Sequence, residues 1–241
     1  MHLKRYFSTI GHLLLAFLWL PILFFDSSFF ADQYFDGKLI TSLLVLLLFI
    51  YLFTTSSLRI KYLMIIMIPL SWLGELLCCV ILDMYDYRGN NIPLYVPVGH
   101  ACVFSLGWKI NQLFDTDTKA AIRKVLTLFF ILLFLFVCFF FNDTLSVALG
   151  LLFFWALNRK KFSSFYLIMS CLVLWIEVIG TNLHVWSWSQ YQWIFQTVNP
   201  PIGSIFIYIG GDMILGRLCR FLLRLRKSQI VRNKLNITSK F

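Results

Sequence analysis

The chain has 241 residues, of which 60% are hydrophobic and 13% are charged. Soluble domains carry roughly 25% charged residues, so this composition excludes an ordinary soluble enzyme and indicates a polytopic membrane protein. The formal net charge of +10 would suggest nucleic-acid binding in a soluble chain. Here the basic residues fall in short clusters between apolar runs, where they report orientation, and we expect no nucleic-acid partner.

Apolar runs near 20 residues, the length that crosses a bilayer, recur along the chain. The sequence predicts an all-α fold with eight transmembrane helices, at residues 8–25, 39–55, 62–82, 93–113, 125–141, 144–157, 165–183 and 201–222. Only Asn142 and Asp143 separate the fifth span from the sixth. A single helix there would be about 50 Å long and would overshoot the hydrocarbon core of ~30 Å, so we predict a turn at Asn142 and Asp143.

Most of the 21 lysine and arginine residues fall in alternate loops if there are eight spans. By the positive-inside rule we expect an inner-membrane protein with both termini cytoplasmic. The basic tail, residues 224–241, should be cytoplasmic. Arg217, Arg220, Arg224 and Lys227 recur every three or four residues, which predicts an amphipathic helix lying against anionic lipid headgroups.

A motif with identical internal spacing, P-[VI]-G-x7-G-x-x-I, runs from Pro97 to Ile110 and again from Pro201 to Ile214. Each copy follows a glutamate inside an apolar run and then an aromatic-x-aromatic pair. This duplication predicts two tandem four-helix repeats, residues 1–114 and 115–223, related by a pseudo-twofold axis along the membrane normal. Small residues let helices approach closely in lipid, so the four motif glycines should mark close helix contacts. They are Gly99, Gly107, Gly203 and Gly211.

The two glutamates, Glu75 and Glu177, lie deep in apolar runs, where a carboxylate costs roughly 2.5–3.5 kcal/mol. We expect both to point into an internal pocket that opens to the outer side. A purely structural alternative is a protonated glutamate that bonds a neighbouring helix. The candidate catalytic residues are Glu75, Glu177, Asp83 and His100. The candidate substrate-binding residues are Tyr85, Tyr87, Arg88, His184, Trp186, Trp188 and Asp212.

No P-loop, dinucleotide fingerprint, G-x-S-x-G elbow or HExxH site occurs, and the six cysteines show no metal-ligand spacing. We therefore expect neither a cofactor nor a metal. The repeated order of buried carboxylate, aromatic-x-aromatic and proline-led helix resembles the membrane-embedded family of small lycopene cyclases and carotenoid hydratases. That resemblance implies acid catalysis on a polyene with Glu75 or Glu177 as proton donor. The cyclases carry carboxylates directly after the proline, whereas this chain has Val98-Gly99-His100 and Ile202-Gly203-Ser204.

The pattern favours an enzyme that performs acid–base chemistry on a lipid or isoprenoid, with membrane lipids and a hydrophobic small molecule as partners. A glutamate kept protonated by desolvation would be the general acid, and the second glutamate, Asp83 or His100 the base. The alternative is a transporter or proton-coupled carrier that uses the same carboxylates. A third hypothesis is a non-catalytic assembly protein. A carrier needs polar groups that continue toward the cytoplasm, and only Asp212 and Lys109 lie there.

Overall fold

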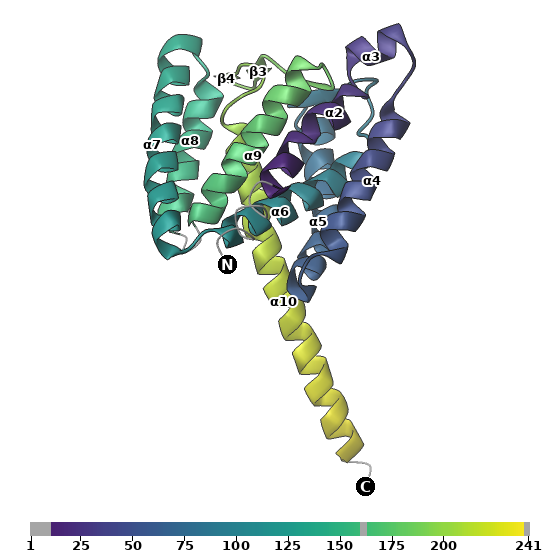
Figure 1. Ribbon diagram of the computed structural model, residues 1–241. Coiled ribbons are helices and arrows are strands. Elements are labelled where there is room, and N and C mark those ends of the chain that lie inside the picture. The colour runs from purple at the N-terminus through teal and green to yellow at the C-terminus, as the bar shows by residue number, and fades with distance from the viewer. Residues whose placement is uncertain (1–10, 160–162, 239–241) are drawn as a thin grey trace.

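The computed structural model describes residues 11–159 and 163–238 of the chain (Figure 1). These residues are mostly helical. The described part of the chain begins with an apolar helix, Gly11–Phe24, whose last part is α2. The helices are α2 (Trp19–Phe24), α3 (Ser28–Gln33), α4 (Lys38–Thr54), α5 (Leu58–Glu75), the π-helix η1 (Leu76–Ile81), α6 (Tyr95–Leu113), α7 (Thr116–Phe141), α8 (Thr144–Asn158), α9 (Ser163–Asn182) and α10 (Ser204–Thr238). The strands are β1 (Tyr85–Tyr87), β2 (Trp186–Trp188), β3 (Tyr191–Gln192) and β4 (Phe195–Gln196).

Within residues 11–159 and 163–238, three helical segments are long and apolar enough to cross a membrane, namely Leu58–Ile81, α7 and α9. The shorter helices Gly11–Phe24, α4 and α8 are also apolar. Large apolar side chains are exposed along the outside of the bundle, including Phe139 and Phe140 on α7. The fold is therefore that of a helical protein with helices suited to a bilayer.

The turn predicted between α7 and α8 is present at Asn142 and Asp143. Asn142 adopts the left-handed conformation (φ 51°) that ends a helix. Asp143 then caps α8, because its carboxylate accepts hydrogen bonds from the backbone N–H of Ser146 at 2.9 Å and from its hydroxyl at 2.6 Å. Helix α7 begins earlier than the predicted span, at Thr116, where Asp115 accepts from Thr118 N–H at 2.8 Å.

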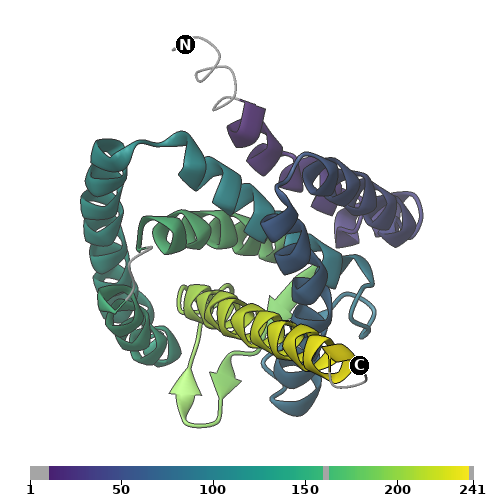
Figure 2. The ribbon, with the colours of Figure 1, turned by 90° about the horizontal axis from the view of Figure 1, so that it is seen from below.

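Helix α10 differs from the predicted division into a span at 201–222 and a separate tail. It continues as one helix of 35 residues to Thr238. Its second half projects beyond the bundle in Figure 1 and therefore points toward the viewer in Figure 2. Helix-forming residues cover the predicted boundary, and nothing there breaks the backbone hydrogen bonding. The last three residues of the predicted tail lie outside the described part of the chain.

Helix α6 lies at the centre of the bundle, packed against α4, α5 and α9. Gly99 and Gly107 on α6 are sites of close approach, as expected. A Cβ at Gly99 would lie 3.2 Å from the Trp19 ring, and one at Gly107 would overlap the Met169 sulfur. Gly203 likewise meets the Ser146 backbone, at 2.8 Å. The expectation for Gly211 is wrong, since a Cβ there would meet nothing within 4 Å.

Candidate functional site

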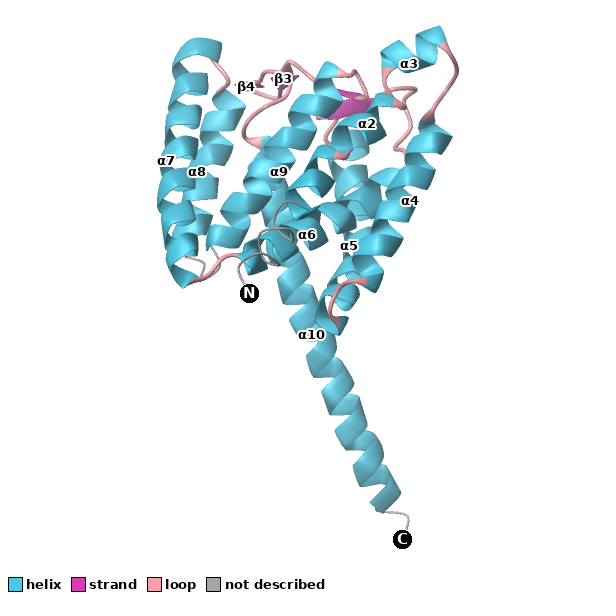
Figure 3. Ribbon diagram, in the orientation of Figure 1, coloured by secondary structure: helices cyan, strands magenta, loops and turns pink. Residues whose placement is uncertain are grey.

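Strands β1 and β2 form a short antiparallel pair that joins the two loops following the glutamate helices. In Figure 3 this pair is the unlabelled magenta element near α2. Tyr85 lies opposite Trp188, and Tyr87 lies opposite Trp186. Successive side chains of a strand point to opposite faces, so the central residues Asp86 and Ser187 are exposed while the four aromatic residues are buried. The strand pair thereby directs all four rings toward the interior of the bundle.

The carboxyl group of Glu75 has close polar contacts with three side chains. Its Oε2 accepts from the hydroxyls of Tyr85 at 2.7 Å and Tyr87 at 2.9 Å. Its Oε1 lies 3.0 Å from Nε2 of His100 on α6. A weaker contact joins Cys79 Sγ to Oε2 at 3.9 Å. Glu75 is 3% exposed, so these contacts replace the water that the carboxylate would lose.

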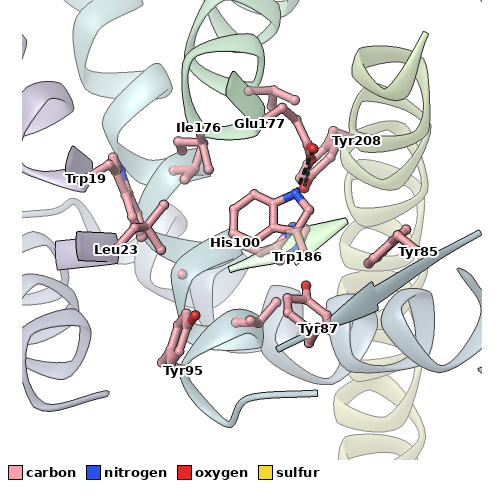
Figure 4. Close-up of a pocket in the computed structure, with 14 residues that line it drawn as sticks. Trp19, Leu23, Tyr85, Tyr87, Tyr95, His100, Ile176, Glu177, Trp186 and Tyr208 are labelled. Carbon is pink, nitrogen blue, oxygen red and sulfur yellow. Dashed lines mark hydrogen bonds between the residues drawn. The ribbon is translucent and has the colours of Figure 1, made fainter. Parts of the chain in front are cut away.

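Glu177 occupies a parallel environment on α9. Its Oε2 accepts hydrogen bonds from the indole N–H groups of Trp186 and Trp188, both at 3.0 Å. Its Oε1 accepts from the hydroxyl of Tyr208 on α10 at 2.7 Å. Figure 4 shows Glu177 between Trp186 and Tyr208 at the wall of a cavity. Each glutamate thus has two donors from the strand that follows its own helix and one partner from another helix.

The two environments differ in what their donors can do. An indole N–H donates and never accepts, so Trp186 and Trp188 hold Glu177 Oε2 as an acceptor only. A phenol or an imidazole can either donate or accept. Tyr85, Tyr87 and His100 can therefore each either donate a hydrogen bond to Glu75 or accept one from it. Among the three partners of Glu177, Tyr208 alone can either donate or accept a hydrogen bond.

Burial, together with the charge of Glu75, raises the pKa values of Tyr85 and Tyr87 well above the usual value for a tyrosine. Both phenols therefore keep their protons at physiological pH and serve as donors to Glu75. The ring of His100 stacks on the ring of Tyr208, with centroids 5.0 Å apart. Glu75, His100, Tyr208 and Glu177 thus form one continuous contact series across the bundle.

Two neighbouring cavities meet at this series. The α6–α9 cavity is small, about 50 Å³, and includes Tyr95, Val96, Ile176 and Glu177 in its lining. The α5–α10 cavity is larger, about 460 Å³, and includes Glu75 and Asp212. Tyr85, His100 and Tyr208 line both cavities. The two glutamates were expected to face one shared cavity, and each instead lines one of an adjoining pair.

Three predicted site residues lie outside both linings. Asp83 and His184 are exposed and occupy turn positions with φ of 51° and 52°. Their backbone carbonyls, not their side chains, accept hydrogen bonds from neighbouring loops. Sequence proximity to the glutamates suggested a chemical role, but a left-handed turn at each position directs the following strand inward and leaves these side chains at the surface.

Arg88, the third, forms an ion-pair cluster at the loop end of the bundle. It binds the fully buried Asp26 carboxylate at 2.6 Å and Asp36 at 2.5 Å. Tyr95 donates to Asp26 at 2.6 Å. Burial raises the pKa of Asp26, and the hydrogen bonds from Tyr95 and Arg88 offset part of that effect. Arg88 therefore ties the β1 loop to the end of α2.

Asp212 is 5% exposed and lines the α5–α10 cavity. Lys109, the other polar residue expected toward the cytoplasm, has different partners, because its Nζ donates to the carbonyl and hydroxyl oxygens of Thr55, each at 3.0 Å. Sequence reasoning missed Tyr208 as a partner of Glu177. The signal that could have identified Tyr208 is its position in an apolar run, one helical turn before Asp212.

Among the residues that the structure describes, no group of three or more His, Cys, Asp or Glu side chains is placed to hold a metal ion. Comparison with protein-family models, with curated proteins and with solved structures gave no match to this chain. The site must therefore be understood from its own geometry.

Proposed function

We propose that this is a multi-pass inner-membrane enzyme that moves protons on a lipid- or isoprenoid-like molecule. Glu75 is the general acid and His100 is its partner base. The observation that carries the proposal is the Glu75–His100 contact of 3.0 Å at the wall of an apolar cavity of about 460 Å³. Apolar pockets with a few convergent polar groups are the usual form of small-molecule sites.

The proposed architecture is eight spans in two four-helix repeats with both termini cytoplasmic. It is supported by the apolar outer surface and by the matched surroundings of Glu75 and Glu177. Reporter fusions after Phe35, Asn91, Asn142 and Ser189 should all report the outer side. A cytoplasmic signal at Asn142 would remove the fifth and sixth crossings from the proposal.

The chemistry begins with Glu75 in its protonated form. Its O–H bond breaks as a new C–H bond forms at one carbon of a substrate double bond, leaving a carbocation. His100 then takes a proton from a neighbouring carbon, so the substrate is isomerised or cyclised with no net change in atoms. The proton returns from His100 to Glu75 across their hydrogen bond. Tyr85 and Tyr87 stabilise the Glu75 carboxylate while it is charged.

Glu177 has a positioning role in this scheme. Its two indole donors favour a fixed carboxylate, and its hydrogen bond to Tyr208 holds the phenol ring against His100. Glu75 and Glu177 are therefore matched in burial and in number of donors, but only Glu75 has a neighbouring base. Because of this difference, Glu177→Gln is the control for Glu75→Gln in the test below.

The test uses protein purified with its co-extracted apolar molecules and incubated in D2O. Deuterium in those molecules, measured by mass spectrometry, reports proton transfer to carbon. General acid catalysis contributes about 10²–10⁴-fold, so Glu75→Gln should reduce the rate of incorporation by at least about 100-fold. Glu177→Gln keeps an acceptor for both indoles and should retain most of the rate. Equal rates in wild type and Glu75→Gln would refute the assignment.

A second candidate function is a proton-coupled carrier. The observation that favours it is Asp212, a buried carboxylate on α10 that extends the polar groups of the site along the α5–α10 cavity. Charged residues inside membrane helices often mark ion or proton pathways. A carrier would incorporate no deuterium into the bound molecule, and proteoliposomes containing it would instead couple movement of that molecule to a pH gradient.

A further inference from the structure

Asp212 has an unusual environment for a buried carboxylate. Within the described part of the chain, its Oδ2 has no hydrogen-bond partner. Glu75 and Glu177, by contrast, each have three hydrogen-bond partners among O–H groups, N–H groups and the His100 ring. A buried polar atom without a partner is destabilising. The fold therefore gives up stability at Asp212.

The α5–α10 cavity explains where a partner would come from. Its walls are mostly apolar, with Leu70, Leu73 and Leu77 on the α5 and η1 side and Ile207 and Ile214 on α10. Asp212 lies one helical turn after Tyr208, about 6 Å along α10, and Tyr208 marks the end of the cavity next to His100. The cavity thus has the Asp212 carboxyl group in its lining at one position and the Glu75–His100 pair at another. Oδ2 of Asp212 is itself buried, so a bound head group would contact it after the carboxyl group turns about its Cβ–Cγ bond.

We propose that Asp212 binds the polar head of the molecule that fills this cavity, and that this head is a hydrogen-bond donor, a hydroxyl or an amine, on an apolar body. At about 30 Å³ for a water-sized group, a cavity of about 460 Å³ has room for roughly 15 such groups. That size fits a chain of about 14 carbons with one head group. A hydrogen bond at Asp212 would hold the apolar body in a defined register against Glu75 and His100.

This inference rests on the proposed function for the reaction at Glu75, but head-group binding is measured separately. The probes are tetradecanol, tetradecylamine and tetradecane, which share a chain and differ in the head. Each is added to purified protein in detergent, and the bound amount is measured by native mass spectrometry. Wild type should favour the alcohol or the amine over the alkane by at least about tenfold relative to Asp212→Leu, which corrects for partition into detergent.

The outcomes distinguish a hydroxyl head group from an amine head group. A preference for the alcohol that depends on Asp212 identifies a hydroxyl, and the same result for the amine identifies an ammonium. Asp212→Leu also removes the unpartnered oxygen, so it should raise the melting temperature, whereas a purely structural role for Asp212 predicts a fall. Equal head-group preference in wild type and Asp212→Leu would overturn the inference.

The Glu75→Gln variant distinguishes failure of this inference from failure of the proposed function. If Asp212 binds the head, Glu75→Gln retains the alcohol or amine preference whether or not Glu75 transfers protons. Loss of the head-group preference in Asp212→Leu, together with normal deuterium incorporation in wild type, supports both assignments. Incorporation without any Asp212-dependent preference leaves the acid–base function standing and refutes the head-group site.

Discussion

Gly180, on α9 one turn after Glu177, is the position at which the site tolerates the least added volume. A Cβ there would overlap three atoms of the Trp186 indole ring. That ring is buried, donates to Glu177 at 3.0 Å and packs against Tyr87 with centroids 6.0 Å apart. Gly180→Ala must therefore displace the indole from the carboxylate or push the helix outward.

The expected magnitude follows from three effects. Overpacking a close contact costs about 1–3 kcal/mol. Loss of one hydrogen bond inside a membrane bundle costs about 0.6–1.7 kcal/mol. Alanine regains about 1 kcal/mol of helix propensity over glycine. The net loss of stability should be about 0.6–3.7 kcal/mol.

The matched control is Gly74→Ala. Gly74 precedes Glu75 in α5, and a Cβ there would meet nothing within 4 Å. This variant gains helix propensity without a clash and should be stabilised by up to about 1 kcal/mol. Thermal unfolding in detergent, followed by size-exclusion chromatography with fluorescence detection, should place Gly180→Ala several degrees below Gly74→Ala. Equal melting temperatures would show that Trp186 does not hold Glu177 as described.

Four further substitutions test other parts of the structure in the same unfolding assay. Arg88→Gln leaves the buried Asp26 carboxylate without its cation and should lower stability by about 1–3 kcal/mol; no change would mean that the cluster is not needed to fix the β1 loop. Asp143→Ala removes the α8 cap and should lower stability by about 0.5–2 kcal/mol, and a wild-type melting temperature would contradict the cap. Asp83→Asn and His184→Asn keep residues that tolerate a positive φ, so stability and deuterium incorporation should stay near wild type. A large loss of deuterium incorporation in either variant would show that the substituted side chain takes part in the reaction.

The sequence singled out the aromatic residues that surround each glutamate, but it predicted them as substrate-binding residues and not as hydrogen-bond donors to the carboxylates. In both halves an aromatic-x-aromatic pair follows the glutamate within about three helical turns of sequence, and alternation along a strand places both rings on one face. It was not sufficient to predict the pairing of β1 with β2, because two strands of three residues carry too little pattern to fix a register. Partners from other helices, His100 for Glu75 and Tyr208 for Glu177, depend on helix packing that periodicity does not determine.

Exposed polar residues near the glutamates were the least reliable guide. Asp83 and His184 stand in the loops that lead to the strands, and their role is visible only in the backbone, where each adopts a positive φ. Asp212 presents the opposite case. Its depth in an apolar run singled it out from the sequence, but only the packed structure gives it a cavity and no partner among the described residues.

Because α10 is continuous, the basic residues of the tail lie on the same helix as two residues of the site. Tyr208 and Asp212 lie inside the bundle, and the exposed Arg217, Arg220 and Arg224 follow on the same helix without a break. Inserting one residue between Asp212 and Arg217 would turn every later side chain by about 100° and advance it by about 1.5 Å. The basic stripe would then face a different side of the bundle while Tyr208 stayed at Glu177. The angle between the basic residues and the cavity around the axis of α10 is thus set by the number of residues between them.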